Sequence, residues 1–158
     1  MNDVSEIIKD KLYLTSLDGC RNCLNDNKLC IDIIVSIIDT YKLNILRDRH
    51  PNIKFVFYAA ADEDDFNITQ YFDEFYKLVQ DNPGSRILVN CYAGASRSAS
   101  LVISYMMNHY SNTKKKKVLL KYSTERFIQI VNNKRNVVSP NNGFIQQLRV
   151  YLISLQNK

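Results

Sequence analysis

Residues Arg86–Ser98, RILVNCYAGASRS, carry the clearest signal of the fold of this chain. Residues 86–89 form a short apolar run, which predicts a buried strand, and residues 98–109 carry an apolar face, which predicts a helix. The loop between them consists mostly of small residues around Gly94, so several backbone N–H groups can point toward one centre. The positive end of the helix dipole points to the same centre, so the stretch predicts an anion-binding site.

Elements of the same two kinds surround this stretch. Strands are expected over residues 11–15, 31–38 and 53–58, and the last two are apolar enough to be buried on both faces. Helices are expected over residues 18–28, with Asp18 as N-cap, over 69–80 and 143–155, and as one or two helices over 118–132. This alternation predicts an α/β domain with a mainly parallel sheet of about five strands flanked by helices. Ligands of such sheets bind beyond the carboxyl ends of the strands, where the loop after residue 89 lies.

Composition excludes several classes of protein. The chain has 158 residues, 46% apolar and 23% charged, which fits one globular domain over residues 1–158 and excludes a disordered or collagen-like chain. Four cysteines are too few for a disulfide framework and indicate a reducing compartment. No run of about 20 apolar residues predicts a membrane span, and residues 1–14 have no signal-peptide pattern. We therefore expect a cytoplasmic protein. Abundant Asn, Ile and Lys, whose codons are AT-rich, indicate an AT-rich genome such as that of a large DNA virus or a protist.

Cys91 and Arg97 give the predicted anion site its chemistry. A thiol at the base of a ring of amides sees positive potential and ionises more readily than a free cysteine. A guanidinium beside it suits bidentate contact with phosphate oxygens. The loop lacks the Gly-Lys-Ser/Thr ending of a nucleotide-hydrolysing P-loop. The alternative for Cys91 is a small apolar residue at the end of a buried strand.

At this point the chain resembles a known family. Residues 91–97, CYAGASR, resemble the C-x5-R signature of protein tyrosine phosphatases, in the AGxSRS form typical of dual-specificity phosphatases. Residues 11–16 resemble the first strand of that family, residues 60–72 its general-acid loop and following helix, and residues 139–148 the entry to its last helix. The resemblance covers nearly the whole chain in the right order, and implies the phosphatase fold with its phosphate-binding loop between a strand and a helix.

The resemblance implies a two-step, metal-independent mechanism without a cofactor. Cys91 is the expected nucleophile, and Asp62 the expected general acid and base, with Asp64 as the alternative. Ser98 is expected to donate a hydrogen bond to the Cys91 sulfur. The phosphate-binding loop is expected to comprise Tyr92, Ala93, Gly94, Ala95, Ser96 and Arg97, with Asn90 and Asn141 in supporting positions.

Asn90 departs from the pattern of the family, which has His directly before the catalytic Cys. An Asn amide can still donate to a loop carbonyl, but it carries no charge. We expect a working enzyme that is slower, by about tenfold for each ~1.4 kcal/mol of thiolate stabilisation lost. This change also motivates the alternative of a weakly active phospho-binding module.

The expected substrate is a phosphoprotein that carries phosphotyrosine or phosphoserine/phosphothreonine. The loop has no lysine between Cys91 and Arg97, unlike the lipid phosphatases of the superfamily, and the chain lacks the extra length of tyrosine-specific domains. An RNA 5′-phosphatase is a further alternative that the net charge of +5 leaves open, although a nucleic-acid partner is disfavoured. We expect a monomer rather than a dimer.

Two further patterns are expected to have no part in catalysis. Cys20 and Cys23 have the spacing of zinc ligands, but no second pair matches them, and Cys30 stands alone, so no metal site is expected. The lysine run over residues 114–117 is interpreted as a solvated loop, with a docking site for acidic partners as the alternative.

Overall fold

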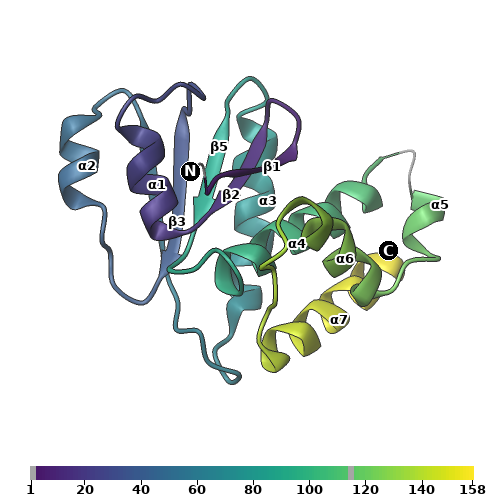
Figure 1. Cartoon of the computed structure of the whole chain (residues 1–158). Coiled ribbons are helices and arrows are strands. Elements are labelled where there is room, and N and C mark those ends of the chain that lie inside the picture. The colour runs from purple at the N-terminus through teal and green to yellow at the C-terminus, as the bar shows by residue number, and fades with distance from the viewer. Residues whose placement is uncertain (1–2, 114–115) are drawn as a thin grey trace.

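The computed structural model describes residues 3–113 and 116–158, and its centre is a five-stranded sheet in the order β1-β2-β5-β3-β4 (Figure 1). The strands are β1 Ser5–Ile8, β2 Leu12–Thr15, β3 Ile33–Ile38, β4 Lys54–Ala59 and β5 Ile87–Asn90. β1 runs antiparallel to β2, and the other three pairings are parallel. The expected α/β fold with a mainly parallel sheet is confirmed.

The three inner strands β2, β5 and β3 are buried along their whole length, and for β5 and β3 the apolar runs predict this burial. β4 differs from its prediction of burial on both faces. It pairs only with β3 and forms an edge of the sheet, so most of its side chains are partly or largely exposed, and Phe57 is 39% exposed. β1, at the opposite edge, was not predicted, because its four residues SEII carry no clear apolar pattern.

The helices are α1 Leu17–Leu24, α2 Asn44–Arg49, α3 Phe72–Asp81, α4 Arg97–Ser111, α5 Lys116–Leu119, α6 Thr124–Lys134 and α7 Asn142–Gln156, and a 3₁₀ turn over Ile68–Tyr71 precedes α3. Of the range 118–132, expected to form one or two helices, α6 covers the larger part and only the end of α5 lies within it. The prediction of Asp18 as N-cap is wrong: Ser16 caps α1, because its extended backbone lets its hydroxyl accept from the N–H of Gly19 at 3.0 Å. Of the lysine run, Lys114 and Lys115 lie outside the described residues.

Two apolar cores cover the two faces of the sheet. Alternate residues of β3 divide between them, with Val35 and Ile37 on one face and Ile34 and Ile38 on the other. α1 closes the smaller core, whereas α3, α4, α6 and α7 close the larger one (Figure 1). Among the described residues, no helix is both long and apolar enough to cross a membrane.

α4 runs through the middle of the larger core. Every residue from Arg97 to Asn108 is buried, so helices pack around it on several sides. β5 lies at the centre of the sheet and leads directly into the loop before α4. The loop of residues 91–96 is therefore held between two rigid elements at the carboxyl end of the central strand.

Candidate active site

The loop after β5 winds tightly around the sulfur of Cys91, which is only 2% exposed. Gly94 has a φ of +68°, in the left-handed region that favours glycine. A Cβ at this position would lie 2.6 Å from the carbonyl of Thr15 at the end of β2. Both constraints call for glycine at position 94, which lets the loop pack directly against the neighbouring strand.

Ser98 and Gly94 donate hydrogen bonds to the Cys91 sulfur. The hydroxyl of Ser98, in the first turn of α4, lies 3.0 Å from Sγ, and the N–H of Gly94 donates to Sγ at 3.2 Å. Burial on its own raises the pKa of the Cys91 thiol, but the hydrogen bonds from Ser98 and Gly94 and the charge of Arg97 outweigh it. The net effect places the pKa of Cys91 below its ordinary value, so the thiolate forms more readily than in free cysteine.

The guanidinium of Arg97 is buried and anchored from one side. Its Nη1 donates to the carbonyl of Ala60 at 3.0 Å and lies 3.8 Å from a carboxylate oxygen of Asp39, whereas its Nε has no partner among the described residues. Ala60 immediately follows β4 and Asp39 follows β3, so two neighbouring strand ends hold this side chain. Such a buried donor is suited to bind an anion beside Cys91.

Asp62 lies over the loop and bonds to it directly. Its Oδ1 accepts from the hydroxyl of Ser96 at 2.7 Å and from the amide of Asn141 at 2.9 Å. Asp64 instead accepts from the N–H of Gly143, at the start of α7. Of these two carboxylates, Asp62 is therefore the one that contacts the loop, while Asp64 fixes the acidic segment to α7.

Asn141 links α7 to the site by three hydrogen bonds. Its side chain caps α7 by accepting from the N–H of Phe144 at 2.8 Å, and its amide donates to Asp62. Its backbone N–H donates to the hydroxyl of Ser96 at 3.0 Å. One residue thus positions the carboxylate, the loop and the helix N-terminus relative to one another.

Gln147 anchors the chain that follows Asp62, a contact that the sequence analysis did not assign. Its Oε1 accepts from the N–H groups of Ile68 and Thr69 at 2.9 and 3.2 Å, and its amide donates to the carbonyl of Phe66 at 2.8 Å. Ile68 is 79 residues away in sequence, so no local pattern could reveal this pairing.

Asn90 is completely buried at the end of β5. Its amide donates to the carbonyl of Cys91 at 3.2 Å, which is the kind of bond expected for an Asn in this position. Its Oδ1 has no partner among the described residues. The side chain thus orients the loop but brings no positive charge to the thiol.

Arg135, at the C-terminal end of α6, was not singled out in the sequence. Its Nε donates to the carbonyl of Gly94 at 2.9 Å and its Nη2 to that of Ala93 at 3.2 Å, so it contacts the loop from behind. It is only 6% exposed. A single arginine in a polar stretch, 41 residues from Gly94, gives no signal that could have found it.

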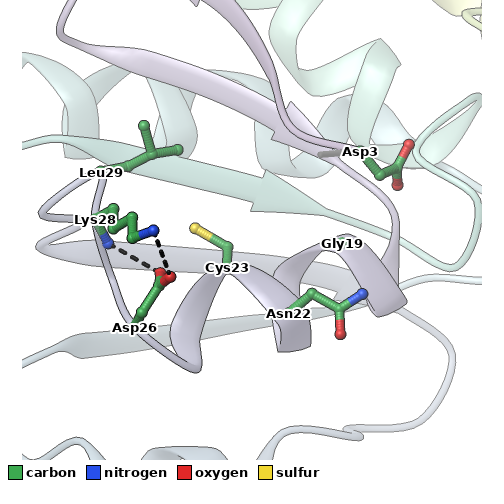
Figure 2. Close-up of a pocket in the computed structure, with 7 residues that line it drawn as sticks. All are labelled: Asp3, Gly19, Asn22, Cys23, Asp26, Lys28 and Leu29. Atoms are coloured by element: carbon green, nitrogen blue, oxygen red, sulfur yellow. Dashed lines mark hydrogen bonds and ion pairs between the residues drawn. The ribbon is translucent and has the colours of Figure 1, made fainter. Parts of the chain in front are cut away.

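The other cysteines lie elsewhere. Cys20 and Cys23 are both on α1, Cys30 is exposed, and all are free thiols. Cys23 and Asp26 line a cavity of about 470 Å³ beside α1 (Figure 2), none of whose lining residues belongs to the loop after β5 or to the segment around Asp62. In the described ranges, no three His, Cys, Asp or Glu side chains are grouped so that they could hold a metal ion.

Comparison with known proteins gives relatives in organisms of several kinds. The chain is 31% identical to Dual specificity protein phosphatase 1 of Arabidopsis thaliana, over 98% of this chain and 72% of that protein. It is 36% identical to AMV078, a tyrosine-phosphatase-like protein of Amsacta moorei entomopoxvirus, over 91% of this chain and 84% of the viral one. It is 30% identical to Tyrosine-protein phosphatase yvh1 of Schizosaccharomyces pombe, of which it spans only 42%.

Solved structures share the fold. The Yvh1 phosphatase domain of Chaetomium thermophilum superposes with a TM-score of 0.79 at 19% identity, over 96% of both chains. The human tyrosine phosphatase-like serine/threonine/tyrosine-interacting protein superposes with a TM-score of 0.74 at 21% identity, over 98% of both chains.

The family model for the catalytic domain of dual specificity phosphatases matches residues 12–153, which is nearly the whole chain. The resemblance found in the loop of residues 91–97 is therefore confirmed along the sequence. The chain belongs to the dual specificity phosphatase family.

Proposed function

We propose that this protein hydrolyses phosphate monoesters on phosphotyrosine and on phosphoserine or phosphothreonine of proteins, through a cysteinyl-phosphate on Cys91. The observation that carries the proposal is the environment of the Cys91 sulfur, which receives hydrogen bonds from Ser98 and Gly94. A thiolate stabilised in this way, beside a guanidinium and a helix N-terminus, is suited to attack phosphorus.

In the first step, the Cys91 thiolate attacks phosphorus in line with the leaving oxygen. The S–P bond forms, the P–O bond to the substrate side chain breaks, and Asp62 gives its proton to the departing oxygen. Arg97 and the loop N–H groups hold the equatorial oxygens, where charge must be stabilised. Asp62 is suited to this role because Ser96 and Asn141 hold its carboxylate over the loop.

In the second step, water attacks the phosphorus of the cysteinyl-phosphate. Asp62 removes the proton from the attacking water, the S–P bond breaks, and the sulfur leaves as thiolate. The Ser98 hydroxyl, 3.0 Å from Sγ, donates to the sulfur as negative charge returns to it. Inorganic phosphate then leaves, and the free thiolate is restored.

The exposure of Tyr92 is consistent with a phosphoprotein substrate. Tyr92, in the loop itself, is 69% exposed, so the edge of the site is open to a side chain presented by a protein surface. We further propose that the domain acts as a monomer in the cytoplasm and that nucleic acid is not its substrate.

Asn90 is the residue that favours a second candidate function, namely a phospho-binding module with little turnover. Its Oδ1 is buried and has no hydrogen-bond partner in the part of the chain that the structure describes. Its amide brings no charge to Cys91, so it stabilises the thiolate less than a protonated His would. Such a module would bind phosphopeptides through Arg97 without releasing phosphate.

Release of phosphate tests these alternatives. We expect the wild-type protein, in the presence of a metal chelator, to release phosphate from an aryl phosphate, a phosphotyrosine peptide and a phosphothreonine peptide. Cys91→Ser should lose this activity, while Cys30→Ser, a change of an exposed thiol, should keep it. Binding of phosphopeptides without release would establish the phospho-binding module instead, and release only from RNA 5′ ends would establish an RNA phosphatase.

A further inference from the structure

All five carbonyls of residues 91–95 are held from outside the ring of loop amides. The amide of Asn90 donates to the carbonyl of Cys91, the N–H of Leu17 to that of Tyr92 at 3.0 Å, and the N–H of Ser139 to that of Ala95 at 2.8 Å. The remaining two, of Ala93 and Gly94, both accept from the Arg135 side chain. Because the carbonyls point outward, the N–H groups of the same loop can point inward toward the anion site. The outside groups that hold the carbonyls therefore shape this site.

We propose that Arg135, held in place by Asp3 of the N-terminal segment, is a positioning residue that sets the oxyanion affinity of the loop and the ionisation of Cys91. The proposal rests on the proposed phosphatase function, and adds to it that the N-terminal segment is part of the catalytic apparatus. Arg135 contacts the loop only through its carbonyls, on the side away from the thiol, so it acts through the loop rather than on the substrate.

The contact with Ala93 links Arg135 to the nucleophile through one peptide group. The carbonyl of Ala93 and the N–H of Gly94 belong to the same planar trans peptide, so they point in opposite directions. Arg135 Nη2 holds the carbonyl at 3.2 Å, and the N–H on the other side donates to Cys91 Sγ at 3.2 Å. If the carbonyl is released, this peptide can rotate, and the thiolate loses one of its hydrogen bonds.

The contact with Gly94 holds the next peptide group in the same way. Arg135 Nε donates to the Gly94 carbonyl, so the N–H of Ala95 is fixed on the opposite side of that peptide. Two parallel donors at the spacing of adjacent carbonyls are a property of a guanidinium, which an ammonium group does not share. A lysine at position 135 therefore keeps the charge but lacks the rigid fork that holds both carbonyls in a fixed geometry.

Asp3 holds the far side of the same guanidinium. Arg135 Nη1 donates to the backbone carbonyl of Asp3 at 2.7 Å, and Nη2 lies 3.1 Å from its carboxylate. The carboxylate also accepts from the N–H and hydroxyl of Ser16, and Thr15 donates to the Asp3 carbonyl at 3.1 Å. In Figure 2 the Asp3 carboxylate points away from Cys23. Asp3 thus ties Arg135 to the end of β2 and the start of α1.

The charges of Asp3 and Arg135 support a fixed ion pair between the two side chains. Burial raises the pKa of Asp3, but the hydrogen bonds of Ser16 and the nearby Arg135 outweigh it and lower the pKa below its usual value. Asp3 is therefore ionised at neutral pH and pairs with an arginine that is only 5% exposed in its side chain. A mostly buried guanidinium that lost this partner would keep an uncompensated charge behind the loop.

The test uses Arg135→Lys, Arg135→Ala and Asp3→Asn in the full chain, with Arg149→Lys as the matched control. Arg149 pairs with Glu125 on the exposed surface between α6 and α7, away from the loop. Thermal unfolding first establishes which variants fold. Two readouts that need no turnover follow, namely the pH dependence of Cys91 alkylation by iodoacetamide and the affinity for tungstate, an oxyanion that mimics phosphate.

We expect folded Arg135→Lys to bind tungstate about tenfold more weakly than wild type, because two hydrogen bonds to the loop are lost or weakened. The alkylation midpoint of Cys91 should shift to higher pH, and Asp3→Asn should change both quantities in the same direction by a smaller factor. Guanidinium ion at millimolar concentration should partly restore tungstate binding to Arg135→Ala. The Arg149→Lys control should match wild type in both readouts.

Folded Arg135→Lys or Asp3→Asn with the tungstate affinity and alkylation profile of wild type would overturn the proposal. If neither Arg135 variant folds, Asp3→Asn decides alone, since it keeps the backbone carbonyl and the side-chain volume. These readouts are also independent of the proposed function, because a protein without phosphatase activity still binds tungstate and still ionises Cys91.

Discussion

The hydroxyl of Ser98 lies 3.0 Å from the sulfur of Cys91, although the two residues are separated by the whole phosphate-binding loop. Ser98 belongs to the first turn of α4 and is completely buried, so its hydroxyl cannot easily turn away from the sulfur. In the proposed mechanism this donor acts mainly in the second step, when negative charge returns to the departing sulfur.

Ser98→Ala should therefore slow the breakdown of the cysteinyl-phosphate more than its formation. A hydrogen bond to a charged group contributes about 1.5–3 kcal/mol, so we expect kcat to fall by roughly 10- to 100-fold. Pre-steady-state release of an aryl leaving group should then show a burst equal to the enzyme concentration. Ser104→Ala, which removes a buried hydroxyl of the same helix that bonds only to a backbone carbonyl, should show neither effect.

The ionisation of Cys91 gives activity a definite pH dependence. Because hydrogen bonds and Arg97 outweigh burial and lower the folded-state pKa of Cys91, the thiolate stabilises the folded protein above the pKa of free cysteine. This stabilisation is lost as the pH falls through the folded-state pKa. Activity should rise with pH through that same pKa.

Alkylation kinetics can compare the ionisation of Cys91 with that of Cys20 and Cys23. Burial raises the pKa of Cys20 to about 12 and also raises that of Cys23. Iodoacetamide at mildly acidic pH should therefore modify Cys91 faster than either of these two, as followed by mass spectrometry of the digested protein. Equal or slower reaction of Cys91 would contradict its assignment as a stabilised thiolate.

Asn90→His should lower the pKa of Cys91. A protonated His at this buried position adds a positive charge next to the loop, where Asn90 supplies only an amide that donates to the Cys91 carbonyl. We expect the alkylation midpoint to move to lower pH and kcat/KM to rise by about tenfold for a gain of ~1.4 kcal/mol. An unchanged or higher midpoint in the folded variant would show that Asn90 does not limit the nucleophile.

Asp62→Asn and Asp64→Asn form a matched pair of variants. Asp62 bonds to Ser96 of the loop, whereas Asp64 bonds to the N–H of Gly143, so we expect Asp62 rather than Asp64 to protonate the leaving group. Asp62→Asn should lower turnover of phosphopeptides by about 10²- to 10⁴-fold, the usual range for a general acid. It should affect aryl phosphates with good leaving groups much less, since these need little protonation.

The same comparison tests the choice between the two carboxylates. Asp64→Asn should retain most of its activity on both kinds of substrate, because the hydrogen bond of Asp64 is made to the start of α7 and not to the loop. A larger loss of peptide activity in Asp64→Asn than in Asp62→Asn would reverse the assignment.

The central part of the fold could be predicted because its signals are local. The apolar runs of β3 and β5 and the loop of small residues around Gly94 are continuous in the sequence, and the structure places them at the centre of the sheet. α2 gave no such signal, because none of its six residues is buried and no side chain caps it. The prediction that β4 is buried on both faces was wrong because β4 lies at an edge of the sheet. Burial there depends on the partner strand rather than on the sequence of β4.

In the site too, contacts between residues close in sequence could be predicted, and contacts between distant segments could not. Cys91, Ser98 and the loop are neighbours in the sequence, so their pattern predicted their contact. The contacts of Gln147 with the chain after Asp62, and of Arg135 with Asp3, join segments up to 132 residues apart. Such contacts follow from how the strands and helices pack, which a single sequence does not display.

Rapid quenching of the reaction can trap the proposed cysteinyl-phosphate on Cys91. A phosphotyrosine peptide mixed with the protein and quenched rapidly in acid should leave one phosphoryl group on the peptide that contains Cys91, and none on those that contain Cys20, Cys23 or Cys30. Ser98→Ala should accumulate more of this species than wild type. Turnover that proceeds without a phosphoryl group on Cys91, or that persists in Cys91→Ser, would contradict the cysteinyl-phosphate mechanism.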